Sequence, residues 1–272
     1  MGLFMNEASL KADMAEAVFR IDGDIAIPSR HAGGPWNPSF QHGSAPASLV
    51  AWASGAIPTA SPMRVARMTI DLIRPVPIAP LKIRARAIRE GRKIQLCEIL
   101  LLADDCEVVR ASVLKVRTAD LAGPPDPTLR ELDLPLPEAG RNPYEIAGIN
   151  NPFLEGIAMH VVKGAIRSPG PAAVWFRVVR PIIEGVAVNG LMRAAITADF
   201  SNGISSVLDL RAWTFINGDL TVSLARDPIG EWILLDAETW LPANGGGIAF
   251  SRLADTSGYF GRAMQTLIVE PK

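Results

Sequence analysis

The chain has 272 residues, of which 49% are apolar and 20% are charged, and its formal net charge is -1 at pH 7. This apolar content is too high for a disordered protein, and a chain of this length buries roughly three quarters of its unfolded surface on folding. The near balance of basic and acidic residues provides no basic field, which argues against binding to nucleic acid or to an anionic membrane surface.

The two cysteines, Cys97 and Cys106, lie nine residues apart in an expected hairpin, which indicates reduced core thiols. This spacing fits neither a disulfide framework nor a metal site, so we expect no metal and no redox cofactor. The first 16 residues carry several charges and do not match a signal peptide. The uncharged stretch 43–63 contains three prolines, which argues against a membrane span. We therefore expect a cytoplasmic location.

The first long apolar segment predicts a helix that begins near Ser44 and continues to about Ala53. Ser44 is its expected N-cap, and Pro46 is tolerated in the first turn. The small residues of this segment would let strands pack closely around the helix. A strand should follow, because Met68 and Ile70 alternate with polar residues.

Residues 118–152 lose this periodicity and contain seven of the 22 prolines of the chain. Proline-rich sequence favours extended, stiff conformations, so this segment is expected to connect two units across the surface. We place an N-terminal unit at 1–120, a linker at 121–150 and a C-terminal unit at 151–272.

The two units contain a diverged internal repeat. "ARMTIDLIRPVP" (66–77) aligns with "GDLTVSLARDPI" (218–229), and "VVRASVLKV" (108–116) aligns with "FGRAMQTLIV" (260–269). The alignment puts Thr69 on Thr221 and Arg110 on Arg262. The alanine-rich segment from Gly190 to Phe200 is the expected counterpart of the first helix. One buried helix wrapped by an antiparallel sheet, present twice, predicts an α+β double hotdog, although two unrelated α+β domains also fit the pattern.

The sequence resembles the double-hotdog acyl-CoA thioesterases of the thioesterase II type, particularly their shorter bacterial relatives. The resemblance covers nearly the whole chain and rests on "GGPWNPSFQHGSAPASLVAWA", "TIDLIRPVP", "REGRK", "PGPAAVWFRVVRP", "ITADF", "DLTVSLARDP" and "GEWILLDAETW". It implies a thioester hydrolase that acts on acyl-CoA without a cofactor, and self-association into a dimer or larger homo-oligomer.

The resemblance also implies three catalytic residues. Asp199 in "ITADF" matches the family's Asp, and Gln265 in "GRAMQTLIV" matches its Gln, where the first repeat has the apolar Val113. Asn217 stands where the family has a hydroxyl residue. The residues alone favour Asp199 as a solvated helix-end carboxylate that pairs with Arg193 or caps Ser201 and Asn202, and Gln265 could be a structural amide that bonds across the sheet. Asn217 could simply form an Asn-Gly turn.

The start of a helix offers free backbone N–H groups for an oxyanion, so we consider His42, Gly43 and Ser44, or Gly190, as substrate-binding residues. Gly43 would permit close approach of a ligand. A lone histidine before a helix more often packs or caps than acts as a base. Trp52 and Phe200 are expected, with Met192, to line the acyl tunnel.

Hydrolysis needs a water molecule, a base and oxyanion donors, and Asp199 suits the base because its helix is otherwise apolar. No G-x-S-x-G motif supports a serine nucleophile. Two alternatives remain: a degenerate acyl-CoA-binding protein, suggested by Asn217, and an enoyl-CoA hydratase. The hydratase would need an Asp/His pair near a helix start, and the sequence gives no convincing one.

Overall fold

The computed structural model describes residues 16–118, 130–143, 151–166, 168–209 and 212–272. Much of the expected linker, at 119–129 and 144–150, lies outside the described residues. The boundaries 1–120, 121–150 and 151–272 therefore stay predictions.

The elements fall into two halves of the chain, each with strands before and after its long helix. The first half contains β1 (Phe19–Asp22), β2 (Ile25–Pro28), η1 (Arg30–Ala32), α2 (Ser44–Ala56), β3 (Met63–Leu72), β4 (Leu81–Glu90), β5 (Ile94–Ala103) and β6 (Cys106–Arg117). Two short 3-10 helices follow, η2 (Pro137–Ala139) and η3 (Leu154–Gly156). The second half contains β7 (Ile157–Lys163), β8 (Ala172–Val178), α3 (Gly190–Asp199), α4 (Ser201–Ile204), β9 (Trp213–Asn217), β10 (Asp219–Leu224), β11 (Trp232–Trp240), β12 (Gly246–Asp255) and β13 (Gly258–Pro271).

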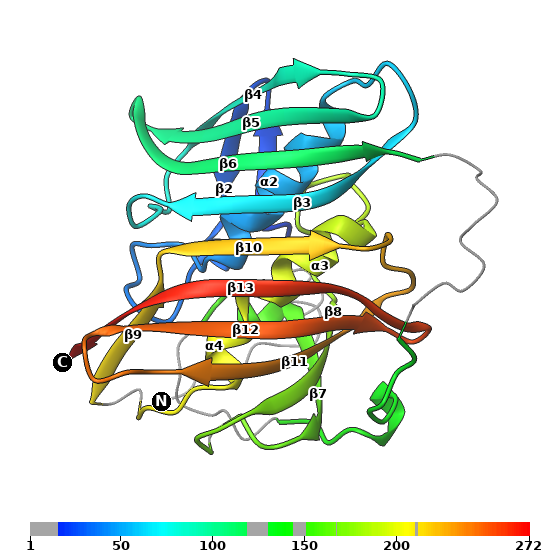
Figure 1. Cartoon of the computed structure of the whole chain (residues 1–272). Coiled ribbons are helices and arrows are strands. Elements are labelled where there is room, and N and C mark those ends of the chain that lie inside the picture. Colours follow the sequence, from blue (N-terminus) through cyan, green and yellow to red (C-terminus); the bar gives the residue numbers. More distant parts are fainter. Residues whose placement is uncertain (1–15, 119–129, 144–150, 167, 210–211) are drawn as a thin grey trace.

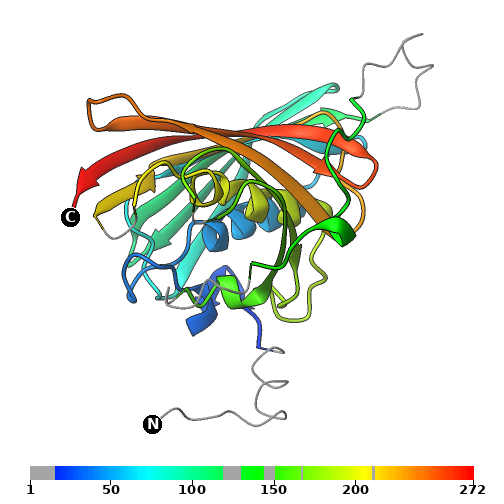
Figure 2. The same cartoon turned by 90° about the horizontal axis from the view of Figure 1, so that it is seen from below.

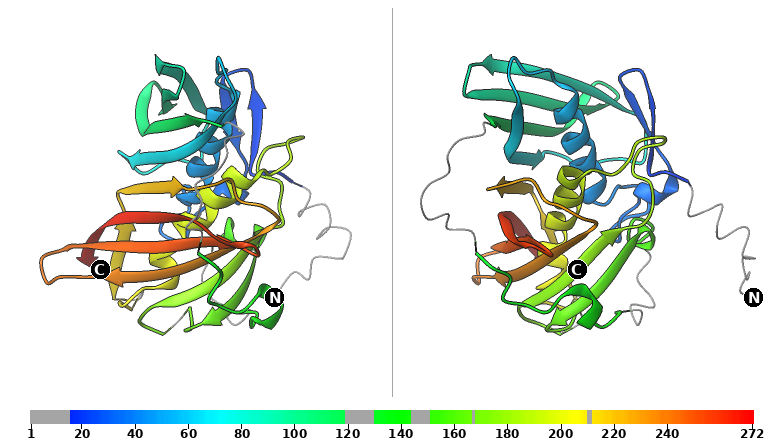
Figure 3. Two further views of the ribbon diagram at one scale, coloured as in Figure 1. Left: turned by 45° about the vertical axis from the view of Figure 1, so that its right-hand side comes forward. Right: turned by 90° about the vertical axis from the view of Figure 1, so that its right-hand side faces the viewer.

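The strands form one curved sheet in the order β1-β2-β4-β5-β6-β3-β10-β13-β12-β11-β8-β7, with β9 paired to β13 (Figure 1). All pairings between these strands are antiparallel. The two halves join edge to edge where β3 pairs with β10. Figures 2 and 3 show α2 and α3 enclosed on the concave side of this sheet. The expected α+β double hotdog is confirmed.

The internal repeat is visible in the strand register. Thr69 and Thr221, which the repeat aligns, are 152 residues apart and pair with each other across the junction of β3 and β10. The irregularity between Leu101 and Leu102 in β5 recurs between Leu253 and Ala254 in β12. The halves are therefore related by an approximate two-fold axis that passes near the Thr69–Thr221 pair.

Both long helices are buried because their side chains are small and apolar. In α2 the buried residues include Ala45, Ala47 and Leu49, and in α3 they include Ala194 and Ala195. Small side chains let the helices approach each other and the sheet closely, so polar groups at the helix ends are also drawn out of solvent.

Two local expectations are wrong. Ser44 is the first residue of α2 and not its N-cap, because Gly43 precedes the helix and the Ser44 hydroxyl bonds elsewhere. Cys106 is exposed rather than in the core, since it begins β6 directly after a tight turn; both cysteines are free thiols, and Cys97 alone is buried. In β3 the expected alternation holds around Met68 and Ile70, which are both buried, and an irregularity between Val65 and Arg67 precedes it.

The described part of the linker region lies on the outer face of the second half. Leu132 and Leu134 pack against Trp175 and Leu234, and the Trp175 indole N–H donates to the Pro135 carbonyl at 2.8 Å. None of the described helices has the length and hydropathy needed to cross a bilayer.

Candidate active site

Asp199 is the last residue of α3, and its carboxylate lies against the first turn of α2. The residue is 7% exposed. Ser44 Oγ, at the start of α2, donates to Asp199 Oδ2 at 2.9 Å and also lies 3.1 Å from the Ile196 carbonyl. The described residues include no Lys or Arg that forms an ion pair with Asp199, so the pairing with Arg193 does not occur. The carboxylate is held by neutral donors and remains available as a base.

Gln265 comes from β13 and is fully buried. Its Nε2 donates to the Asp199 carbonyl at 2.9 Å and lies 3.4 Å from Asp199 Oδ1. Its Oε1 accepts the Asn202 backbone N–H at 3.0 Å. The Gln265 amide therefore connects the end of α3 and the first turn of α4 to the sheet. Its partners lie on helices, not on a neighbouring strand.

Asn217 ends β9, and Gly218 separates it from β10. Its Nδ2 donates to Asp199 Oδ1 at 3.0 Å and to the Asp219 carbonyl at 3.3 Å. The residue thus occupies a strand junction, as its turn signal suggests, and contacts the carboxylate as well. The structure therefore brings Asp199, Gln265 and Asn217 together.

Gly43 faces this carboxylate from the other helix. A Cβ atom at this position would lie 2.6 Å from Asp199 Oδ1, so only glycine fits here without a shift of the carboxylate. The neighbouring amides of His42 and Ala45 are bonded to backbone carbonyls. The Gly43 N–H has no hydrogen-bond partner among the residues that the structure describes, and it stands at the positive end of the α2 dipole.

His42 also belongs to this cluster. Its Nδ1 accepts the Ser44 backbone N–H at 3.1 Å and lies 3.2 Å from Asp199 Oδ2. Its ring contacts those of Phe153 and Phe200, with centroid distances of 5.2 and 4.8 Å. The sequence-based expectation that no Asp/His pair lies near a helix start is wrong, because a contact between residues of different halves cannot be read from local spacing.

Two of the expected substrate-binding residues lie elsewhere. Gly190 begins α3, nine residues before Asp199 and therefore about 14 Å away along the helix axis. A Cβ there would meet the Pro228 carbonyl at 2.5 Å. Trp52 lies eight residues after Ser44 in α2 and lines a separate cavity of about 400 Å³ beside β4. Phe200, by contrast, contacts His42.

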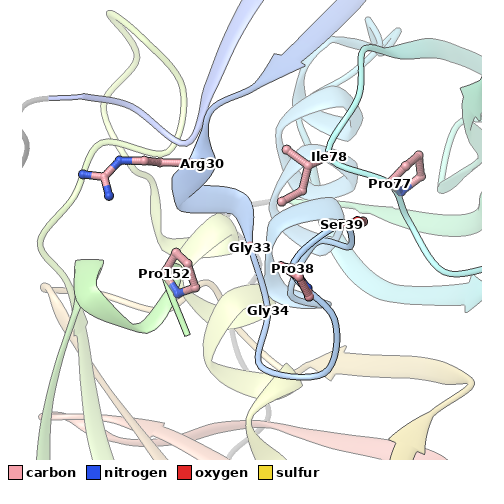
Figure 4. A pocket seen from close by; sticks show the side chains of 8 residues that line it. All are labelled: Arg30, Gly33, Gly34, Pro38, Ser39, Pro77, Ile78 and Pro152. Carbon is pink, nitrogen blue, oxygen red and sulfur yellow. The ribbon is translucent and has the colours of Figure 1, made fainter. Parts of the chain in front are cut away.

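A larger cavity of about 620 Å³ lies near the start of α2 (Figure 4). Its lining is mostly proline, glycine and aliphatic, with one cationic side chain: Arg30, Gly33, Gly34, Pro38, Ser39, Pro77, Ile78 and Pro152. The cavity lies next to the candidate site. A Cβ at Gly34, which lines the cavity, would lie 3.1 Å from His42 Cα. The Phe153 N–H donates to the carbonyl of Gly33, another lining residue.

Sequence reasoning missed the structural part played by Phe153 and Asn202. Phe153 covers one face of His42, and nothing in its local sequence signals this. The Asn202 backbone N–H donates to Gln265 and its Nδ2 donates to the Phe215 carbonyl, while its buried Oδ1 has no partner in the described part of the chain. Its position just after a helical segment that ends in Asp was the only available signal. Among the described residues no cluster of His, Cys, Asp or Glu could hold a metal ion.

Comparisons with known proteins agree with this architecture. The acyl-CoA thioesterase N-terminal domain matches residues 32–116, and the acyl-CoA thioesterase C-terminal domain matches residues 126–269. No curated protein matches the sequence.

Three solved structures share the fold at low sequence identity. A hotdog protein of unknown function from Alicyclobacillus acidocaldarius is 14% identical, with a TM-score of 0.73 over 95% of this chain and 98% of that chain. A candidate thioesterase II from Thermobifida fusca is 13% identical, with a TM-score of 0.71 over 95% and 97%. The acyl-CoA thioesterase II TesB2 from Mycobacterium marinum is 12% identical, with a TM-score of 0.65 over 96% and 98%. The two domain matches cover most of the sequence, and the chain therefore belongs to the acyl-CoA thioesterase family, as a thioester hydrolase with the double-hotdog fold.

Proposed function

We propose that this thioesterase hydrolyses acyl-CoA to a free fatty acid and CoA by direct attack of a water molecule that Asp199 activates. The observation that carries the proposal is that the buried Asp199 carboxylate lies against a helix start where the Gly43 N–H has no partner among the described residues. A general base and an oxyanion donor are the two groups that water-mediated acyl transfer needs.

The arrangement supports separate roles for the two carboxylate oxygens. Oδ1 accepts from Asn217 and lies within reach of Gln265, so these amides fix the orientation of the carboxylate. Among the described residues Oδ2 accepts one hydrogen bond, from the Ser44 hydroxyl, and keeps acceptor capacity for a water molecule. In the proposed reaction the water oxygen attacks the thioester carbonyl carbon while its proton moves to Asp199.

The Gly43 N–H would then stabilise the charge that develops on the carbonyl oxygen. When the tetrahedral intermediate collapses, the C–S bond breaks and CoA leaves as a thiolate, which takes up a proton to give the thiol. Ser44 fits poorly as a nucleophile in a covalent route, because its side chain is fully buried and already donates to Asp199 Oδ2.

Turnover of a panel of acyl-CoAs of increasing chain length, followed by release of free thiol, tests this proposal. We expect hydrolysis of at least one chain length. If calorimetry shows that acyl-CoA binds but no turnover is detected, the degenerate binding protein is favoured. Asn217, which stands where the family has a hydroxyl residue, is the reason for considering this alternative.

Asn217→Thr sharpens the same test. A threonine hydroxyl can donate to Asp199 Oδ1 as the amide does, so we expect kcat to stay within about fivefold of the wild type. Asn217→Leu removes the donor and should lower kcat by roughly 10-fold or more. Equal activity of both variants would remove Asn217 from the proposed site.

The contact between His42 and Asp199 favours one second candidate, hydration of an enoyl-CoA, in which water adds to the carbon-carbon double bond. Incubation with an enoyl-CoA and detection of the 3-hydroxyacyl product by mass spectrometry test it. Formation of free thiol without this product would leave hydrolysis as the single reaction.

A further inference from the structure

His42 is held more firmly than a surface histidine. Phe153 is stacked nearly parallel to one face of its ring, at an interplanar angle of 13°, and Phe200 is tilted by 34° against it. The side chain is 12% exposed. Rotation of the ring is therefore restricted by the two phenylalanines, and Nδ1 keeps its direction.

The hydrogen bond to Nδ1 identifies the protonation state of the ring. The Ser44 backbone N–H donates to Nδ1 at 3.1 Å, and a backbone N–H is always a donor. Nδ1 must then offer its lone pair, which places the ring proton on Nε2 and makes the imidazole neutral. Asp199 Oδ2 is close to Nδ1, at 3.2 Å, yet between these two described side chains no aligned hydrogen bond is formed.

The same bond has a consequence for the helix start. Because the His42 ring takes the Ser44 N–H, while the His42 and Ala45 amides bond to carbonyls, the Gly43 N–H remains as the unpaired donor of this turn within the described residues. Gly43 lies between these two bonded residues and approaches the carboxylate of Asp199 closely.

We infer that His42 is a positioning residue: its neutral ring caps α2 through Nδ1, and this cap holds the Gly43 amide and the Asp199 carboxylate in place without any proton transfer by His42. The inference rests on the proposed function of Gly43 and Asp199. It differs from a His/Asp acid-base pair, because Nδ1 accepts the Ser44 N–H and, among the described residues, no hydrogen bond joins Nδ1 to Asp199 Oδ2.

Two variants separate these roles. His42→Asn keeps an acceptor near the position of Nδ1 but has no Nε2, whereas His42→Phe keeps the stacked ring but has no acceptor. We expect His42→Phe to lower kcat by about 10- to 100-fold, the usual cost of misplacing an oxyanion donor. We expect His42→Asn to restore kcat to within about fivefold of the wild type, with KM changed less than about threefold in both variants.

A proton-transfer role predicts a different pattern, in which His42→Asn loses as much kcat as His42→Phe. That result would overturn the inference. His160→Asn and His160→Phe are matched controls, because His160 is a partly buried histidine on β7 whose ring is tilted against that of Trp232. Neither control should change kcat.

Nuclear magnetic resonance of the wild-type protein with ¹⁵N-labelled histidine tests the inference without activity. The chain has three histidines, and the spectrum of His42→Asn identifies the signals of His42. At about pH 7 we expect a protonated Nε2 and an unprotonated Nδ1. A protonated Nδ1 would contradict the inference even in an active enzyme, whereas the expected tautomer in a protein that hydrolyses no acyl-CoA would contradict the proposed function alone.

Discussion

In both halves of the molecule a side chain of the last strand donates to a carbonyl at the end of the long helix, but the residues involved differ. In the second half, Gln265 of β13 reaches the Asp199 carbonyl at the end of α3. In the first half, Lys115 of β6 is buried and donates from Nζ to the Ile57 carbonyl just after α2, at 2.7 Å. Each half therefore uses a buried polar side chain of its last strand to satisfy a carbonyl at the end of its helix.

The difference lies in what accompanies that contact. At the end of α3 the carbonyl belongs to an aspartate, whose carboxylate turns toward the start of α2. At the end of α2 the corresponding residues are Ala56 and Ile57, which carry no reactive group. The position of Gln265 in the repeat is occupied in the first half by Val113, and Lys115 lies two residues further along the strand. Both halves therefore satisfy a carbonyl at a helix end from the last strand, but from different strand positions, and only the second half places a carboxylate, the proposed base, beside that contact.

The largest expected effect follows from removing that base. Asp199→Asn keeps the size of the side chain and an oxygen that can accept from Asn217, but it cannot take a proton from water. We expect kcat to fall by roughly 100-fold or more, with folding intact, measured by thiol release and circular dichroism. Asp71→Asn, at an exposed carboxylate of β3, is the control and should leave kcat unchanged.

A smaller loss of kcat is expected from adding a side-chain atom at Gly43, where the start of α2 lies against Asp199. Gly43→Ala introduces a Cβ within 2.6 Å of Asp199 Oδ1, which would displace the carboxylate or the helix start. We expect kcat to drop by about 10- to 100-fold. Gly55→Ala in the same helix has nothing within 4 Å of the added Cβ and is the matched control. It should keep wild-type kcat and gain up to about 1 kcal/mol of stability, because alanine favours the helix. Equal activity of the two variants would contradict the close contact.

Gln265→Val makes the second half resemble the first at one position. The change leaves the Asp199 carbonyl and the Asn202 N–H without their partner, so we expect a loss of about 1–3 kcal/mol in the free energy of unfolding and a kcat lower by roughly 10-fold. Urea unfolding and steady-state kinetics measure the two effects. Thr266→Val, at the neighbouring exposed position, should change neither. Full activity in Gln265→Val would show that the amide is structural only.

The smallest effect concerns the first half and is confined to stability. Burial lowers the pKa of Lys115 from its ordinary value, so the folded protein binds this proton less readily than the unfolded chain does. The free energy of unfolding should therefore rise with pH between the folded and the unfolded pKa of this amine. Lys115→Met removes this contribution. In this variant the free energy of unfolding, measured with urea, should rise less steeply between pH 8 and about 10 than in the wild type.

Lys82→Met, at a more exposed lysine, should keep the wild-type dependence of the free energy of unfolding on pH. Because Lys115 caps the other end of α2, Lys115→Met should leave kcat near that of the wild type. A large loss of kcat in this variant would show that the two helix ends are more strongly coupled than their contacts indicate.

The fold was accessible from the sequence because its signals are local and repeated. Alternation in the strand around Met68 and Ile70 and the match of Thr69 to Thr221 were enough to indicate two related units, but not that β3 and β10 form their junction. Asp199 and Gln265 came from the family resemblance, and the repeat added that Gln265 has only Val113 as its counterpart.

The remaining features of the site depend on contacts between distant residues. Ser44 has the sequence features of an N-cap, yet packing of α2 against α3 directs its hydroxyl to Asp199, 155 residues away. The contact of His42 with Phe153 and Asp199 likewise joins three separate segments. Gly190 has the same local features as Gly43, but it begins the helix that ends in Asp199, so the length of α3 separates the two.

The central claim is that the Asp199 carboxylate and the Gly43 amide act on one thioester carbonyl. A crystal structure with a non-hydrolysable acyl-CoA analogue that retains the carbonyl tests it most directly. The account predicts the carbonyl oxygen about 3 Å from the Gly43 nitrogen, with Asp199 Oδ2 placed to hold a water molecule against the carbonyl carbon. A carbonyl bound beside Trp52 in the smaller cavity, or anywhere else out of reach of Asp199, would contradict it.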